Sequence, residues 1–229
     1  MPNNSTKLGF TLAEVLITLC VVGILASATI PALVQTTRDK ELKVAWQKFY
    51  AIFSQATISA VADNGGTLQG IPIYYQPVLS KYLNYMSYKK NCTGWDAYDG
   101  NCWHSNDGTV KYLNGNPAIS VWPDEAGMLL NNGMMFLLGG HTSVDCSNFY
   151  DGGYDTPLYK NSNSSGVCAY VIVDVNGGKN PNTIGKDIFG LYIFPTRVLP
   201  FGSDDNAPPA TDCTDSGEGW GCSAKYLTE

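Results

Sequence analysis

The sequence predicts an α+β protein, in which one long N-terminal helix is followed by a small antiparallel sheet with disulfide-pinned loops. Three observations predict this fold. An apolar run over residues 10–34 continues into a stretch of helical periodicity. Short β-branched and aromatic segments, bounded by Gly and Asn, follow. The 24 Gly and 12 Pro indicate many turns between these segments.

Composition excludes several classes of protein. Hydrophobic residues form 44% of the 229-residue chain, which is too few for a polytopic membrane protein. The 14 Tyr and 5 Trp argue against disorder. The net charge of −6 argues against a nucleic-acid partner. The charge is also uneven, because residues 1–62 carry a net +2 and residues 63–229 carry a net −8.

Residues 10–34 contain a single charged residue, Glu14. As a helix, this run is about 37 Å long at about 1.5 Å per residue. That length crosses a hydrocarbon core of about 30 Å. One alternative is a buried core helix, although such helices rarely stay apolar on all faces. The other is a signal peptide cleaved after the run, although the run passes into a charged helical pattern without a clear break.

Residues 35–62 continue the helix as an amphipathic segment. Its apolar residues recur every three or four positions: Leu42, Ala45, Trp46, Phe49, Ile52, Phe53, Ala56 and Ala60. The Asn-Gly-Gly at residues 64–66 is a C-terminal stop. We therefore expect one helix from near Phe10 to near Ala62. Pro31 lies inside it and is expected to kink it.

Glu14 requires an explanation, because a carboxylate within hydrocarbon is costly. It needs a cationic partner or a proton. No Lys or Arg lies within one helical turn of it. A free α-amino group on Phe10, one turn away, would serve if the mature chain began there.

Residues 9–19, Gly-Phe-Thr-Leu-Ala-Glu-Val-Leu-Ile-Thr-Leu, resemble the processing signature of type IV prepilins and type II secretion pseudopilins. The polar leader at residues 1–9, with Lys7, is similar to theirs in length and charge. Gly23 and Pro31 also stand where that family usually carries a Gly and a Pro. The resemblance covers about 35 residues closely.

The resemblance implies that a membrane-embedded prepilin peptidase cleaves the Gly9–Phe10 bond and N-methylates Phe10. It implies that Glu14 pairs with the N-terminal amine of a neighbouring subunit in a helical filament. Partners would be copies of the chain or related pilins, the peptidase and an inner-membrane assembly platform. The function implied is a structural one, in a type IV pilus or a type II secretion pseudopilus. The alternative is a membrane-tethered periplasmic binding protein or enzyme that uses the helix only as an anchor.

We expect four segments: a leader (1–9), a transmembrane and assembly helix (10–34), its amphipathic continuation (35–62) and a pilin-like domain (63–229). The expected location is the bacterial inner membrane, crossed once, with the N-terminus cytoplasmic. Basic residues flank the span on both sides, so the positive-inside rule does not decide the orientation. The orientation must therefore be inferred from the compartment in which the cysteines form disulfides.

Six of the seven Cys follow the anchor, and an even number there is typical of disulfides formed in an oxidising compartment. Among about 15 connectivities, proximity in the sequence favours the pairs Cys92–Cys102, Cys146–Cys168 and Cys213–Cys222. A zinc site is the alternative, but no CxxC pair is present. Cys20, in the apolar run, is expected to be a small hydrophobe.

The second half of the chain predicts strands at residues 118–122, 133–138, 167–175 and 188–194. Residues 200–229 are acidic and rich in Gly, Pro and Asp, and we expect a disulfide-pinned surface loop there.

Carboxylates and amides at residues 174–187 resemble a calcium loop, with Asp174, Asn176 and Asp187 as candidate ligands. An EF-hand is excluded, since Gly185 stands at the twelfth position. The alternative is a tight Asn-Gly turn in which Asp and Asn cap backbone groups.

The sequence contains no GxSxG, HExxH or phosphate-loop motif. His141 lies near Asp145 in the sequence, but an isolated pair of this kind is far more often structural. No catalytic residue is therefore predicted.

Overall fold

The computed structural model describes residues 9–71, 75–97, 101–105, 109–118, 126–142, 144–147, 149–150, 166–203 and 210–229. The chain divides into two compact units, Met1–Glu41 and Leu42–Glu229.

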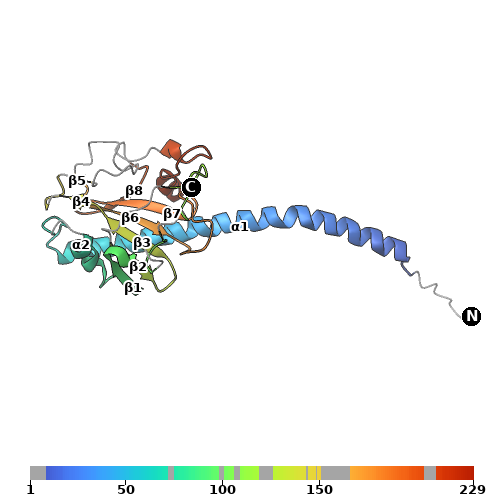
Figure 1. The fold of residues 1–229 in the computed structure, drawn as a ribbon, viewed down its shortest axis with the longest axis horizontal. Helices are drawn as coiled ribbons and strands as arrows, with labels where there is room; N and C mark the ends of the chain where they lie inside the picture. Colours follow the sequence, from blue (N-terminus) through green and yellow to red (C-terminus); the bar gives the residue numbers. More distant parts are fainter. Residues whose placement is uncertain are drawn as a thin grey trace, which may run out of the picture. The chain divides into compact units, whose positions relative to one another are not determined.

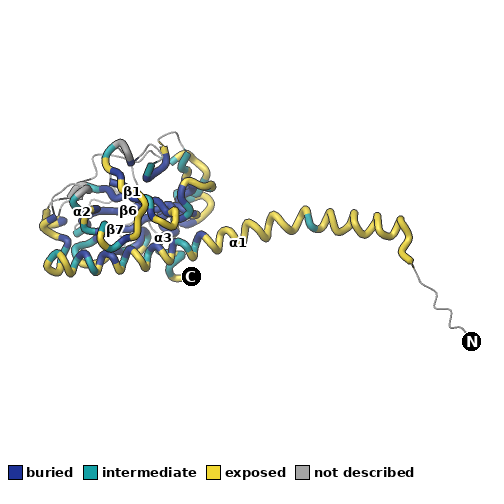
Figure 2. The backbone as a smooth tube through the Cα atoms, turned by 90° about the horizontal axis from the view of Figure 1, so that it is seen from below, coloured by how far each residue is buried: buried dark blue, intermediate teal, exposed yellow. Residues whose placement is uncertain are grey.

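Helix α1 (Leu12–Asp63) contains 52 residues, close to the predicted span. It continues through Pro31 without interruption, and a kink at this residue stays a prediction. In the first unit every described side chain is exposed except the half-buried Ala26 (Figure 2). In the second unit α1 buries one face, formed by Leu42, Trp46, Phe49, Phe53, Ala56, Thr57 and Ala60.

The second unit contains a six-stranded antiparallel sheet in the order β1-β2-β3-β6-β7-β8 (Figure 1). Its strands are β1 (Tyr88–Thr93), β2 (Ala126–Leu130), β3 (Met135–Gly139), β6 (Ala169–Asp174), β7 (Ile188–Ile193) and β8 (Val198–Pro200). A separate pair is formed by β4 (His141–Thr142) and β5 (Phe149–Tyr150). The remaining helices are α2 (Tyr75–Tyr82), the 3-10 turns η1 (Gly94–Ala97) and η3 (Ala210–Asp212), and α3 (Cys222–Thr228).

Aromatic packing joins α1 to one face of the sheet. The Trp46 ring stacks on Phe189 of β7 at 4.9 Å between centroids. Phe49 and Phe53 contact Phe136 of β3 at 5.8 and 5.9 Å. All five side chains are fully buried. Burial of each such side chain contributes about 1.5–3 kcal/mol before entropy is counted, so this layer is the main core of the unit.

Loops and aromatic rings cover the opposite face of the sheet. Alternate side chains of β6 and β7, such as Ile172 and Tyr192, pack there with Trp103, Phe201 and Trp220. A Cβ on Gly190 would lie 2.0 Å from the Phe201 ring, so only glycine fits at this position of β7. Both faces of β6 and β7 are buried as a result.

The structure confirms the α+β class and three predicted strands, which correspond to β3, β6 and β7. The remaining predicted strand is the one at residues 118–122. Residues 119–122 lie outside the described residues, and Ala118 is not in a strand. The prediction of a disulfide-pinned surface loop at residues 200–229 is confirmed for the disulfide, Cys213–Cys222, and was wrong for the surface loop. Helix α3 forms there, and Cys222 and Ser223 are buried beside Trp46 and β7. Trp220 is buried against Phe201 on the opposite face of the sheet.

Candidate functional site: the surface of helix α1

A reciprocal hydrogen-bonded cap begins helix α1. The backbone N–H and the hydroxyl of Thr11 both donate to the Glu14 carboxylate at 2.8 Å. The N–H of Glu14 donates in return to Thr11 Oγ1 at 3.2 Å. This Thr-x-x-Glu arrangement is a capping box, and it satisfies N–H groups that the first helical turn leaves free. The sequence contains this spacing, so Glu14 caps the helix in addition to its expected need for a cationic partner or a proton.

The first unit has an apolar surface and no core among its described residues. Phe10 is 88% exposed, and Leu12, Leu25 and Leu33 are exposed to similar degrees. Helix α1 is long and apolar enough to cross a membrane, and the apolar window that qualifies it is not buried within the protein. The alternative of a buried core helix therefore has no support in this part of the chain.

The solvent face of α1 in the second unit is almost uncharged. No Asp, Glu, Lys or Arg occurs between Lys48 and Asp63. Val44, Ala51 and Ile58 recur every seven residues on this face, and Val44 and Ile58 are 62% and 57% exposed. A helix that borders only on water normally carries charged residues on its outer face. This face is therefore suited to packing against another surface.

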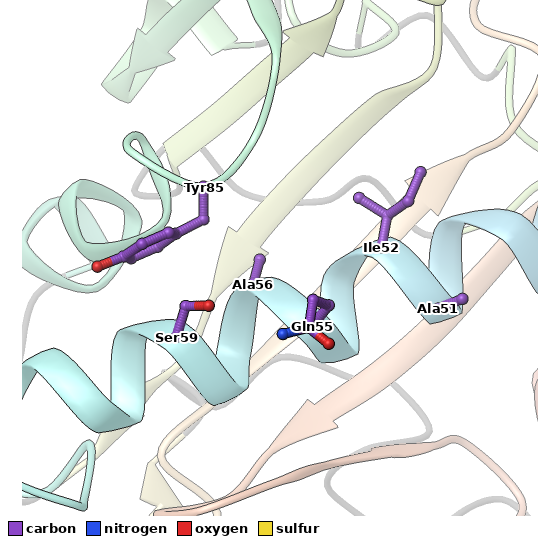
Figure 3. A pocket seen from close by; sticks show the side chains of 6 residues that line it. All are labelled: Ala51, Ile52, Gln55, Ala56, Ser59 and Tyr85. Carbon is purple, nitrogen blue, oxygen red and sulfur yellow. The ribbon is translucent and has the colours of Figure 1, made fainter.

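A shallow groove of about 400 Å³ lies along this part of α1. Its lining residues are Ala51, Ile52, Gln55, Ala56, Ser59 and Tyr85. Figure 3 shows Tyr85 opposite the helix, on the loop that follows α2. The Tyr85 hydroxyl donates to the Asp63 carboxylate, and this hydrogen bond is the main reason that the pKa of Tyr85 is raised. The bond fixes one wall of the groove to the end of α1.

The C-terminal helix α3 is attached to the first turns of α1 within the second unit. Trp46 Nε1 donates to the Ser223 carbonyl, and Gln47 Nε2 donates to the Tyr226 carbonyl, both at 2.9 Å. Lys43 lies 4.0 Å from the centre of the Tyr226 ring and 2.8 Å from a Glu229 carboxylate oxygen. These contacts hold α1 in place without using its uncharged face.

The structure contains three disulfides, Cys92–Cys102, Cys146–Cys168 and Cys213–Cys222. They are the pairs that proximity in the sequence favoured. They close loops with sequence separations of 10, 22 and 9 residues. Cys20 is a free, exposed thiol. With six cysteines in disulfides, the zinc alternative loses its thiolate ligands.

Two of the candidate calcium ligands lie where β6 ends and β7 begins. Asp174 is the last residue of β6, and Asp187 comes directly before β7. The Asp187 carboxylate accepts hydrogen bonds from the backbone N–H groups of Asn182 and Thr183 and from the Asn176 side chain, at 2.8, 2.6 and 3.1 Å. Asp174 accepts the Asn176 N–H at 2.9 Å, and its other oxygen lies 2.7 Å from His104 Nε2.

This donor set does not fit calcium. Calcium takes about six to eight oxygen ligands, whereas N–H donors already surround both carboxylates. Within the described ranges, no group of three or more His, Cys, Asp or Glu is arranged to hold a metal ion. The geometry favours the capped-turn alternative, and we assign no metal to these residues.

Burial controls the charge of these two carboxyl groups. It raises the pKa of Asp174 to about 6, with the nearby Asp187 charge adding to the effect and His104 opposing it. Burial also raises the pKa of Asp187, against the hydrogen bonds that it accepts.

The predicted neighbours His141 and Asp145 form no site that can be described. The His141 side chain lies outside the described residues. One Asp145 oxygen accepts two hydrogen bonds from Ser147, at 3.1 and 2.7 Å, in a local turn.

Residues 1–8 of the predicted leader lie outside the described residues, whereas Gly9 and Phe10 are described and exposed. Comparison with family models, curated proteins and solved structures finds no match to this chain.

Proposed function

We propose that the protein is a structural subunit of a type IV filament machine, either a type IV pilin or a type II secretion pseudopilin. Prepilin peptidase cleaves it at Gly9–Phe10 and methylates Phe10. Before assembly, the chain is anchored in the bacterial inner membrane with its disulfide-bonded unit outside. It then enters a filament with copies of itself or with related pilins, through the inner-membrane assembly platform.

The uncharged outer face of α1 in the second unit is the observation that carries this proposal. An anchor needs apolar residues only over the membrane-length run. Here Val44, Ala51 and Ile58 continue an exposed apolar surface along the folded unit. Lateral packing of equivalent helices would bury both segments together. That explains why one helix is apolar outside a membrane as well as within it.

Glu14 supports the same proposal by a different route. In a bundle of apolar helices an unpaired carboxylate is costly. The Thr11 hydrogen bonds reduce that cost but leave the charge in place. The freed ammonium group of Phe10 on a neighbouring subunit would neutralise it and set the axial step between subunits.

The rival function is a tethered periplasmic binding protein or enzyme. The groove in Figure 3 is the described feature that a small ligand would use, but it is shallow and lined mainly by Ala, Ile and Ser. A tether also gives Gly9 and the outer face of α1 no role, and it leaves Glu14 only its role as a helix cap. We therefore place the filament function first.

Substitutions at Glu14 and Thr11 separate the assembly role from the capping role. Glu14→Gln keeps a capping-box side chain but removes the charge, whereas Glu14→Ala removes both. Thr11→Ala removes the cap and keeps the charge. We expect both Glu14 variants to lose filament or secretion output in a strain that carries only the variant. We expect Thr11→Ala to retain most of it.

The control for this series is an equal amount of processed protein in the membrane fraction. Normal assembly by Glu14→Ala would show that the carboxylate is not an assembly element, and the tether function would then lead. Loss of assembly only in the two variants that break the cap, Thr11→Ala and Glu14→Ala, would assign Glu14 to helix capping.

Processing is tested by the intact mass of the protein extracted from membranes. We expect the loss of nine residues and the addition of one methyl group on Phe10. A mature chain that begins beyond Ala26 would instead identify a cleaved signal peptide and a secreted protein.

A further inference from the structure

A buried polar cluster lies on the side of the sheet away from α1. It joins parts of the chain that are far apart in the sequence, because His104 and Asp174 are separated by 70 residues. The side chains of His104 and Asp174 are 5% and 0% exposed. Buried polar groups of this kind are costly unless they are paired.

His104 follows directly after the loop closed by the first disulfide. Cys102, two residues earlier, is bonded to Cys92 of β1. Trp103, between Cys102 and His104, is buried, with its ring edge-on to His104 at 5.2 Å between centroids. The segment at residues 101–105 is thus fixed covalently to β1 by the disulfide and to the end of β6 by the His104 hydrogen bond.

The other side of the cluster is the connection between β6 and β7. Asp187 draws it into a turn by accepting the N–H groups of Asn182 and Thr183. Lys111 N–H donates to the Asn182 carbonyl at 3.0 Å, so the segment at residues 109–118 is held by the same connection.

We propose that His104, Asp174, Asn176 and Asp187 form a metal-independent polar clasp that locks the segment at residues 101–105, which the first disulfide ties to β1, onto the β6–β7 connection. The clasp holds two carboxylates in place with N–H donors, where a loop of similar composition could use a calcium ion. It closes the face of the sheet that α1 does not cover. The segment at residues 101–105 and the β6–β7 connection consequently open together or not at all.

Two buried oxygens make a bound cation the main alternative to the clasp. Asn176 Oδ1 and Asn182 Oδ1 are buried and have no hydrogen-bond partner among the described residues. A cation would need these oxygens together with carboxylate oxygens that already face N–H groups. The two accounts predict opposite responses to calcium.

The test uses the full chain in detergent micelles, with hydrogen exchange followed by mass spectrometry. His104→Gln and Asp174→Asn should speed exchange at residues 101–105 by about tenfold or more, as expected for loss of a hydrogen bond to a charged group. Exchange in β3 and β7 should change much less. His141→Gln replaces the chain's other histidine and is the matched control, with no expected effect at residues 101–105.

The wild-type protein provides a test that does not depend on a variant folding. Its thermal midpoint should be the same in calcium chloride and in EDTA, and residues 101–105 and 175–187 should show the same opening free energy. A rise in the midpoint with calcium that Asp187→Asn abolishes would replace the clasp by a metal site. Unchanged exchange in His104→Gln, or independent opening of the two wild-type segments, would also overturn the proposal.

Discussion

The two units of this chain gain stability in opposite ways. In residues 42–229 the helix buries Trp46, Phe49 and Phe53 against a sheet, and disulfides close the loops. In residues 9–41 the same helix buries no described side chain. The described side chains of the first unit are therefore left open to their surroundings, whereas the second unit buries its own core. Substitutions should follow this division.

The largest effect should come from the core of the second unit. Trp46→Ala removes the ring that stacks on Phe189 and donates to Ser223, and it should cost about 3–5 kcal/mol of unfolding free energy. Leu25→Ala, at an exposed site in the first unit, should leave the unfolding free energy of the second unit unchanged. Chemical denaturation of both variants in micelles checks this. Equal losses would mean that the two units do not divide the stability as described.

The disulfides should have the next largest effect. Each loop closure is worth about 3 kcal/mol in the chain-entropy model. Reduction should therefore lower the thermal midpoint of the second unit strongly while α-helical signal from the first unit in micelles persists. Alkylation of the denatured, unreduced protein should label Cys20 alone. Labelling at any other cysteine would contradict the pairing.

The pH dependence of stability should reveal Asp174. Burial raises its pKa to about 6 in the folded protein, whereas in an unfolded chain Asp titrates near 4. The folded state therefore binds the proton more tightly. This contribution to stability is fully present below about pH 4 and is lost as the pH rises through about 6. The loss is about 3 kcal/mol, since each of the two pKa units corresponds to about 1.4 kcal/mol.

Asp174→Asn should flatten this part of the curve, measured as the free energy of unfolding at half-unit steps between pH 4 and 7. His104 and Asp187, which act on Asp174, remain in both proteins. If the two curves run parallel, Asp174 is not the group that titrates.

The sequence predicted those features that depend on local pattern. The periodicity around Trp46 and Phe49 predicted α1, and β-branched runs predicted β6 and β7. Proximity was enough for the disulfide pairs because each closes a short loop. The edge strand β1 was missed since its Lys, Lys and Asn lack an apolar alternation, and α3 was missed since its segment is short and follows an acidic, Gly-rich run.

The polar features were harder to predict because they depend on tertiary contacts. Nothing in the sequence pairs His104 with Asp174 across 70 positions, and the hydrogen bonds to Asp187 form only when the turn closes. The Glu14 cap is different, since the Thr-x-x-Glu spacing is local. The sequence interpretation of Glu14 rested on its charge within an apolar run and did not include this capping motif.

The most direct test of the central claim asks what covers the outer face of α1. A photo-crosslinking amino acid at position 58, where Ile58 is exposed on that face, would be activated in cells that assemble the protein. The control carries the same group at Asn91, an exposed position on β1. The filament account predicts adducts with copies of this chain or related pilins from position 58 and few from position 91. Adducts with lipid alone, or no adducts from position 58, would contradict it.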